Sequence, residues 1–195
     1  MKTKFILFLS VVFTALTGCD AAKQVEGAYN MTQCKYNYRS ISALTVSGMD
    51  LSKGLSPAYI PQITSLLSGK SSSIPLNFTL NLDVTNPNQS AAMLQGLQYA
   101  VSIDGIEFTA GKVDQMLNIP SGGTQTVPLH IGFDVATFMK GESKNAVSNI
   151  VKNFIGIGSE KSNVTIQLKP SFKIGSQIIT SPYNIPVSFS FGGKN

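Results

Sequence analysis

The chain carries few side chains suited to acid–base or metal chemistry. His130 is its only histidine, and no Cys-x-x-Cys pair is present to complete a zinc site with it. Asp104 and Glu107 are close enough in sequence to suggest paired catalytic carboxylates. Asp104-Gly105 is, however, typical of a tight hairpin turn, which puts both carboxylates at an exposed tip instead of across a cleft. We therefore expect no enzyme activity, no metal and no cofactor.

The two cysteines have different expected fates. Cys19 ends the sequence Leu16-Thr17-Gly18-Cys19, which follows two lysines and an apolar run, residues 5–15. This run is too short to span a bilayer stably, and its position is typical of a secretory signal peptide. The arrangement resembles the lipobox of bacterial lipoproteins, whose cysteine is diacylated; an ordinary signal peptide with an accidental cysteine is the alternative. Cys34 is expected to be a buried small hydrophobe, with a reactive or intermolecular thiol as the alternative.

The resemblance to a lipobox divides the chain into three segments. Residues 1–18 are expected to be a lipoprotein signal peptide, residues 19–34 a lipidated N-terminus and tether, and residues 35–195 a single folded domain. Two acyl chains such as palmitate hold a protein on a membrane that it does not span. We expect a bacterial envelope protein, on the outer rather than the inner membrane, and leave the periplasmic or surface face open.

The charge pattern argues against nucleic acid as a partner. Removal of residues 1–18 takes away Lys2 and Lys4, which lowers the basic count from 15 to 13 against 10 acidic residues and the net charge from +5 to +3. The remaining lysines lie singly, whereas a nucleic-acid surface gathers basic residues along the phosphates. The expected partners are the membrane, through the N-terminal lipid, and an envelope protein or glycan.

Alternation of apolar and polar residues predicts the strands that position these side chains. The clearest strand is 74–85, in strict period two. Segments 97–103 and 106–108 flank the Asp-Gly turn and predict a hairpin. A first strand is expected over Tyr36, Tyr38 and the stretch 41–46, and further strands at 127–133, 164–168, 172–174 and 185–191. Repeated strands with one apolar face predict a mainly β fold, an antiparallel β-sandwich.

Two segments interrupt this rhythm and predict helices. Segment 56–69 has apolar residues at helical spacing, with Pro61 shortening or kinking the helix. Segment 147–155 has apolar residues at i, i+3, i+4, i+7 and i+8, and Gly156 ends it. Both helices are expected to lie against the sandwich, because short helices gain most of their stability from packing. Residues 20–33 are small and polar without a sustained period, which predicts a tether.

The tripeptide Asn86-Pro87-Asn88 follows the clearest strand. Pro87 cannot continue a central ladder, and the asparagine side chains can close a turn. This tripeptide, the tyrosine-containing strand 97–101, the Asp-Gly turn and the sequence Val127-Pro128-Leu129 occur in the order of a known family. The chain resembles the type 2 late embryogenesis abundant family, also called the water-stress and hypersensitive-response (WHy) domain, which has bacterial lipoprotein versions.

This resemblance covers about residues 41–191 and implies a small antiparallel sandwich similar to fibronectin type III, with a helix beside it and no known active site. It implies a role in desiccation or other stress. We expect a non-catalytic, membrane-anchored lipoprotein acting in envelope stress tolerance or protein interaction. The alternative is a binding module for envelope polysaccharide, lipid or a partner protein. Its loops at the ends of the sandwich offer the candidate binding residues Gln89, Ser121, Gly122, Gly123 and Tyr183.

Overall fold

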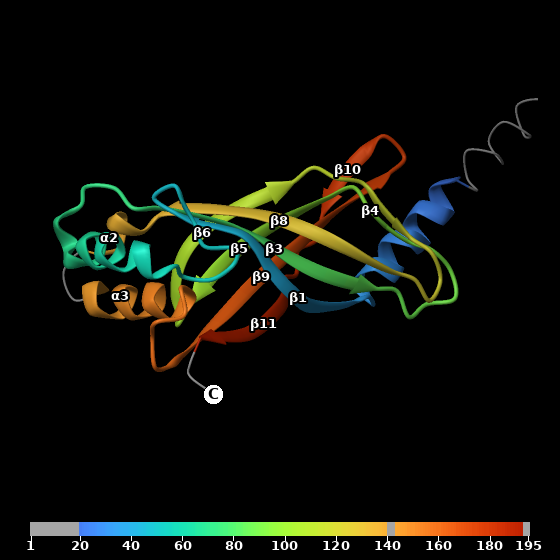
Figure 1. The fold of residues 1–195 in the computed structure, drawn as a ribbon. Coiled ribbons are helices and arrows are strands. Elements are labelled where there is room, and N and C mark those ends of the chain that lie inside the picture. The colour runs from blue at the N-terminus through green and yellow to red at the C-terminus, as the bar shows by residue number, and fades with distance from the viewer. Residues whose placement is uncertain (1–19, 140–142, 193–195) are drawn as a thin grey trace, which may run out of the picture.

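Two antiparallel β-sheets pack face to face and form the body of the protein (Figure 1). The computed structural model describes residues 20–139 and 143–192. The first sheet has the strand order β2 (Met49–Asp50), β1 (Lys35–Val46), β3 (Pro75–Thr85) and β8 (Thr124–Asp134). This architecture confirms the predicted mainly β, antiparallel sandwich.

The second sheet is centred on one long strand. Its order is β10 (Gln177–Thr180), β9 (Lys161–Ile174), β5 (Gly96–Ile103) and β6 (Ile106–Val113), and β11 (Ile185–Gly192) also pairs with β9. A small third sheet joins β4 (Ala92–Leu94) to β7 (Leu117–Ile119). The expected strands 164–168 and 172–174 are one continuous strand, which corrects that prediction. The strands β2, β4, β7 and β10 are too short to show a period of two in the sequence.

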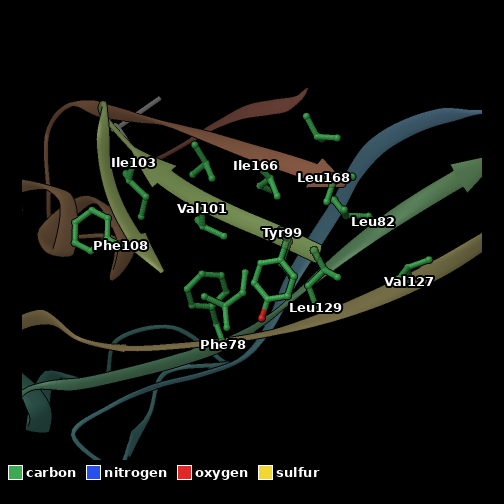
Figure 2. Packing of buried hydrophobic residues seen from close by; sticks show 14 of the residues in the cluster. Phe78, Leu82, Tyr99, Val101, Ile103, Phe108, Val127, Leu129, Ile166 and Leu168 are labelled. Atoms are coloured by element: carbon green, nitrogen blue, oxygen red, sulfur yellow. The ribbon is translucent and has the colours of Figure 1, made fainter. Parts of the chain in front are cut away.

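Alternating residues of both sheets fill the space between them. Leu80 of β3 is completely buried and lies opposite Leu129 of β8. Figure 2 shows Leu129 beside Tyr99 of the second sheet. The next residue pair along the first sheet is Asn81 and Pro128, so Pro128 lies within β8, at the edge of that sheet. The period of two read from the sequence therefore assigns these residues to the correct faces.

The Asp104-Gly105 turn joins β5 to β6, as the sequence predicts. Asp104 has a φ of 48° and Gly105 a φ of 82°, and positive φ at both central residues is the signature of the favoured two-residue hairpin turn. The carboxylate of Asp104 accepts a hydrogen bond from the backbone N–H of Asn163 at 2.8 Å. Asp104 is thus used to position the hairpin tip against the start of β9.

Aromatic side chains close both long edges of the sandwich. At one edge Tyr38 of β1 stacks on Phe189 of β11, with ring centroids 3.9 Å apart. At the other edge Phe108 of β6 packs on Phe133 of β8, with ring centroids 4.8 Å apart. Next to them Tyr99 of the inner strand β5 donates its hydroxyl to the carbonyl oxygen of His130 in β8 at 2.7 Å. A Cβ atom on Gly111 in β6 would lie 2.5 Å from that hydroxyl oxygen. The glycine therefore leaves the space that Tyr99 needs to reach the opposite sheet.

The two expected helices lie together at one end of the sandwich (Figure 1). The first is a mixed helical segment, made of η1 (Pro57–Tyr59), α2 (Ile60–Ser65) and η2 (Leu66–Lys70). The second is α3 (Ser143–Phe154), and a short turn, η3 (Val135–Thr137), follows β8. Ile63 of α2 and Val147, Ile150 and Val151 of α3 are buried, so the predicted packing of both helices is confirmed.

At the opposite end, residues 20–32 form a helix where the sequence predicts a tether. Its buried residues include Ala28, Asn30 and Met31, and a Cβ on Gly27 would lie 2.8 Å from Cγ of Met93 in β4. The helix packs through small residues and close approach to β4, which leaves little apolar periodicity for the sequence to reveal. The tether prediction is wrong for these residues.

The register of β3 can be tested by truncating its most buried leucine. We expect Leu80→Ala to lower the free energy of unfolding by about 2 to 5 kcal/mol, because it leaves a cavity between the sheets. Asn77→Ala, on the exposed side of the same strand, should change it by less than about 0.5 kcal/mol. Equilibrium urea unfolding measures both, and equal effects of the two substitutions would contradict this register.

Candidate functional site

The Asn86 side chain is fully buried at the end of β3 and joins several loops. Its exposed fraction is 0%. Its amide nitrogen donates to the carbonyl oxygens of Ser90, Ile119 and Pro120 at 2.9, 2.9 and 3.2 Å. Its amide oxygen accepts from the backbone and side-chain nitrogens of Asn88 at 3.0 and 2.8 Å. Asn86 therefore holds its own loop and the connection between β7 and β8 in one place.

The same network continues into the N-terminal helix. The Asn88 side chain donates to the carbonyl oxygen of Asn30 at 3.0 Å. The Asn30 side chain donates back to the hydroxyl of Ser90 at 2.7 Å and to the carbonyl oxygen of Ala91 at 3.1 Å. The Ser90 hydroxyl donates to the Glu26 carboxylate at 2.5 Å. These bonds fix the helix to the Asn86 loop, and we call the whole arrangement, with the segment 119–123, the asparagine joint.

Four of the candidate loop residues come together in this joint. The backbone N–H of Asn86 donates to the carbonyl oxygen of Gly123 at 2.9 Å. The Ser121 hydroxyl donates to the carbonyl oxygen of Asn88 at 2.7 Å. Gly122 has a φ of 68°, a conformation that favours glycine, and Gln89 is exposed in the facing loop. Polar groups of these two loops therefore form hydrogen bonds with one another, which hold the loops together.

Tyr183 lies apart from the other candidate residues, in the link between β10 and β11. Its side chain is 78% exposed. The backbone of Tyr183 exchanges hydrogen bonds with the Ser181 hydroxyl at 2.9 and 3.1 Å. The next residue, Asn184, lines a hollow of about 470 Å³ on the outer face of the second sheet, with Gln98, Lys112, Gln167 and Lys169.

The sequence matches one family over this region. A family model described as late embryogenesis abundant protein (LEA_2) matches residues 81–190, which is more than half of the chain. The chain belongs to this family. The match includes the Asn86-Pro87-Asn88 motif and extends from the middle of β3 into β11.

Several solved structures are similar to this late embryogenesis abundant protein at low identity. A crystal structure of a protein from Archaeoglobus fulgidus is 12% identical, covers 82% of this chain and 99% of its own, and has a TM-score of 0.37. A solution structure from Arabidopsis thaliana is 7% identical, covers 81% and 77%, and has a TM-score of 0.38. A solution structure described as a late embryogenesis abundant protein is 12% identical, covers 97% and 86%, and has a TM-score of 0.36. A search of curated proteins found no significant match.

Cys34 of this late embryogenesis abundant protein lies between the end of the N-terminal helix and the start of β1. Its thiol is buried and donates to the carbonyl oxygen of Asn30 at 3.4 Å. Burial raises the pKa of the Cys34 thiol to about 11. The sulfur is therefore protonated at neutral pH, and a protonated thiol is a poor nucleophile. The prediction that Cys34 is buried is confirmed.

His130 lies on the solvent face of the first sheet, as the alternation in β8 predicts. Its ring nitrogen Nδ1 is 3.1 Å from the hydroxyl of Thr79 on β3, directly across the strand pair. Within residues 20–139 and 143–192, no cluster of three or more His, Cys, Asp or Glu side chains is placed to hold a metal ion. Glu107 is exposed beyond the hairpin turn, and Asp104 bonds the backbone of Asn163.

The expected lipid site cannot be placed beside these residues, because Cys19 and the signal peptide 1–18 lie outside the described residues. In the part of the chain that is described, no helix combines the length and the apolar character needed to cross a membrane.

Sequence reasoning identified Asn86 and Asn88 but missed Glu26, Asn30 and Ser90. These three residues lie in polar segments without a period, and their partners are about 60 residues away in the chain. The spacing of residues within the segment of Glu26 and Asn30, or within that of Ser90, does not predict that the two segments form hydrogen bonds with each other.

The asparagine joint predicts a strong effect of Asn86→Ala. This substitution leaves buried carbonyl oxygens without donors, and we expect the free energy of unfolding to fall by about 2 kcal/mol or more. Hydrogen exchange of the amides in residues 20–32 should also accelerate, because the helix loses its fixed contact. Gln89→Ala in the same loop is the matched control and should change neither quantity. Unfolding in urea and exchange mass spectrometry measure the two effects, and an unchanged exchange rate would show that the joint does not hold the helix.

Proposed function

We propose that this protein is a non-catalytic, WHy-type lipoprotein, held on a bacterial envelope membrane by acyl chains on Cys19. In this proposal it acts as a stress-tolerance or interaction scaffold at the membrane surface. The observation that carries the proposal is the sequence Leu16-Thr17-Gly18-Cys19, directly followed by a helix that is fixed to the sandwich. A lipid at this point would hold the folded body itself at the membrane.

The outer face of the first sheet supports a scaffold role. Arg39 on β1 lies 3.3 Å from the carboxylate of Asp83, which also accepts from the Thr126 hydroxyl at 2.7 Å. The bond from Thr126, together with that from Arg39, lowers the pKa of Asp83. Beside them the Asn81 amide donates to the hydroxyls of Ser40 and Ser42, both at 3.1 Å. Polar groups engaged with one another across three strands favour a rigid hydrated surface over a reactive one.

The hollow on the second sheet favours binding of an envelope glycan as a second candidate function. Its lining includes the small residues Ala100 and Ala110, amide side chains and two lysines, of which Lys112 also pairs with Asp114 at 2.8 Å. Amides bind sugar hydroxyls, and lysines bind the carboxylate or phosphate groups of acidic glycans. Tyr183, whose side chain is exposed, directly precedes the lining residue Asn184 in the chain. Thermal stabilisation by envelope glycans would favour this candidate over a plain scaffold.

The lipid anchor can be tested by removing its acceptor. Cys19→Ser should abolish incorporation of a palmitate analogue and move the protein from the detergent phase to the aqueous phase on phase separation. Cys34→Ala is the matched control, because it removes the only other cysteine, and it should leave both properties unchanged. In the source bacterium, Cys19→Ser should also fail to restore survival on drying to a deletion strain. Labelling that persists in Cys19→Ser would refute the anchor.

A further inference from the structure

Two elements project together at the end of the sandwich opposite α2 and α3. These are the N-terminal helix and the hairpin of β9 and β10 (Figure 1). The Gln24 side chain of the helix accepts a hydrogen bond from the backbone N–H of Gly175, at the hairpin turn, at 2.6 Å. Gln24 also lines a groove of about 320 Å³ with Met93, Met116 and Phe172. We call the helix 20–32, the hairpin and the Met116 segment the helix end of the molecule. The opposite end, which carries α2 and α3, is called the distal end.

Large apolar side chains are exposed at the helix end. Ile178 and Ile179 of β10 are 65% and 46% exposed, and Met116 is 67% exposed. Val25 and Tyr29 are one helical turn apart, on the side of the helix that faces away from the sandwich, and both are exposed. Five of the nine large apolar side chains that are exposed in residues 20–139 and 143–192 therefore lie at this one end.

The chain geometry places this end beside the proposed anchor. Residues 20–24 advance about 6 Å along the helix axis, and the link from Cys19 adds at most about 4 Å. Because the helix is fixed by the asparagine joint and by Gln24, no flexible linker separates the body from residue 20. Acyl chains on Cys19 would bring the exposed side chains at this end to the bilayer surface.

The side chains at the helix end suit the boundary between lipid headgroups and acyl chains. Isoleucine, valine and methionine gain free energy when they leave water, and tyrosine favours this boundary because its ring is apolar and its hydroxyl is polar. Lys23 of the helix and Lys173, which lies opposite Ile178, are exposed at this end, and so are the carboxylates of Asp20 and Asp114. The end therefore has no excess of positive charge for anionic headgroups, and apolar contact is the main interaction with the bilayer. The carboxylate of Glu26 on the same helix accepts from Ser90.

We propose that the helix end docks on the phospholipid bilayer, with Val25, Tyr29, Met116, Ile178 and Ile179 entering the interfacial layer. Because Ile178 and Ile179 are neighbours in β10 and point to opposite faces of the strand, the hairpin enters this layer edge-on. This inference rests on the proposed lipid anchor and adds the orientation of the body. The long axis of the sandwich then stands away from the membrane, and α2 and α3 form the distal end. The hydrophobic contact is a second attachment that acts with the acyl chains.

Depth measurements on the full-length acylated protein test the proposal. Nitroxide labels are attached through Ile178→Cys or, at the distal end, Ile157→Cys, each in the Cys34→Ala background. The protein is reconstituted in vesicles of phosphatidylethanolamine and phosphatidylglycerol. In the vesicles, the label at 178 should be several-fold less accessible to a water-soluble nickel relaxant than the label at 157. It should also be more accessible to oxygen, which concentrates in the lipid phase. The label at 157, whose native side chain is 41% exposed, should stay accessible to nickel.

A charge substitution provides the matched control. Ile178→Asp with Ile179→Asp should restore nickel access to a label at Val25→Cys several-fold. Ile60→Asp with Ile157→Asp changes two apolar residues of similar exposure at the distal end, 44% and 41%, and should leave that label protected. Thermal unfolding of each variant verifies that the fold persists.

The outcomes separate docking from anchoring. Acyl labelling of the same samples reports the anchor, so an unacylated protein overturns the proposed function and the docking that rests on it. An acylated protein whose label at 178 is as accessible to nickel as the label at 157 keeps its anchor, and docking is refuted. A label sheltered from both nickel and oxygen would indicate a protein partner at this end and would also overturn docking on lipid.

Discussion

Burial of the Asn86 amide is the constraint on which one end of this molecule depends. An amide removed from water is strongly destabilising unless its hydrogen-bonding groups find partners. Asn86 finds them in its own loop and in residues 119–120, and Asn88 extends the network to Asn30. Because these bonds must form together, the end of β3, two loops and the N-terminal helix have one common arrangement. The helix is thereby part of the folded body.

The sequence predicts those elements whose signal is local. The alternation in β3 assigns Leu80 to the core and places the strand correctly, and the Asp104-Gly105 dipeptide contains its own turn geometry. The sequence does not predict the helix at 20–32, because the stability of this helix comes from distant partners, such as Met93, which packs against Gly27. The sequence does not predict very short strands such as β10 for a related reason, since β10 is defined by its pairing with β9 and not by its own composition.

The candidate site shows the same division between local and distant information. Asn86-Pro87-Asn88 was recognisable as a strand terminator, because proline and asparagine have conformational preferences of their own. Its role as a joint was not recognisable, because its acceptors are backbone carbonyls, which every residue type provides. The burial of Cys34 is predictable from its residue type. The groove beside Gln24 is not predictable from the sequence, because its lining residues come from distant parts of the chain.

Pro128 in the edge strand β8 has a consequence for the behaviour of the protein in crowded solution. An unpaired strand edge offers a row of N–H and C=O groups to which another chain can add, and this is a common start of aggregation. Proline has no N–H, so the row on β8 is interrupted at its middle. When water is withdrawn and protein concentration rises, such an interrupted edge is a poor template for intermolecular sheet growth. Addition of a further strand to this edge of the first sheet is therefore disfavoured at Pro128.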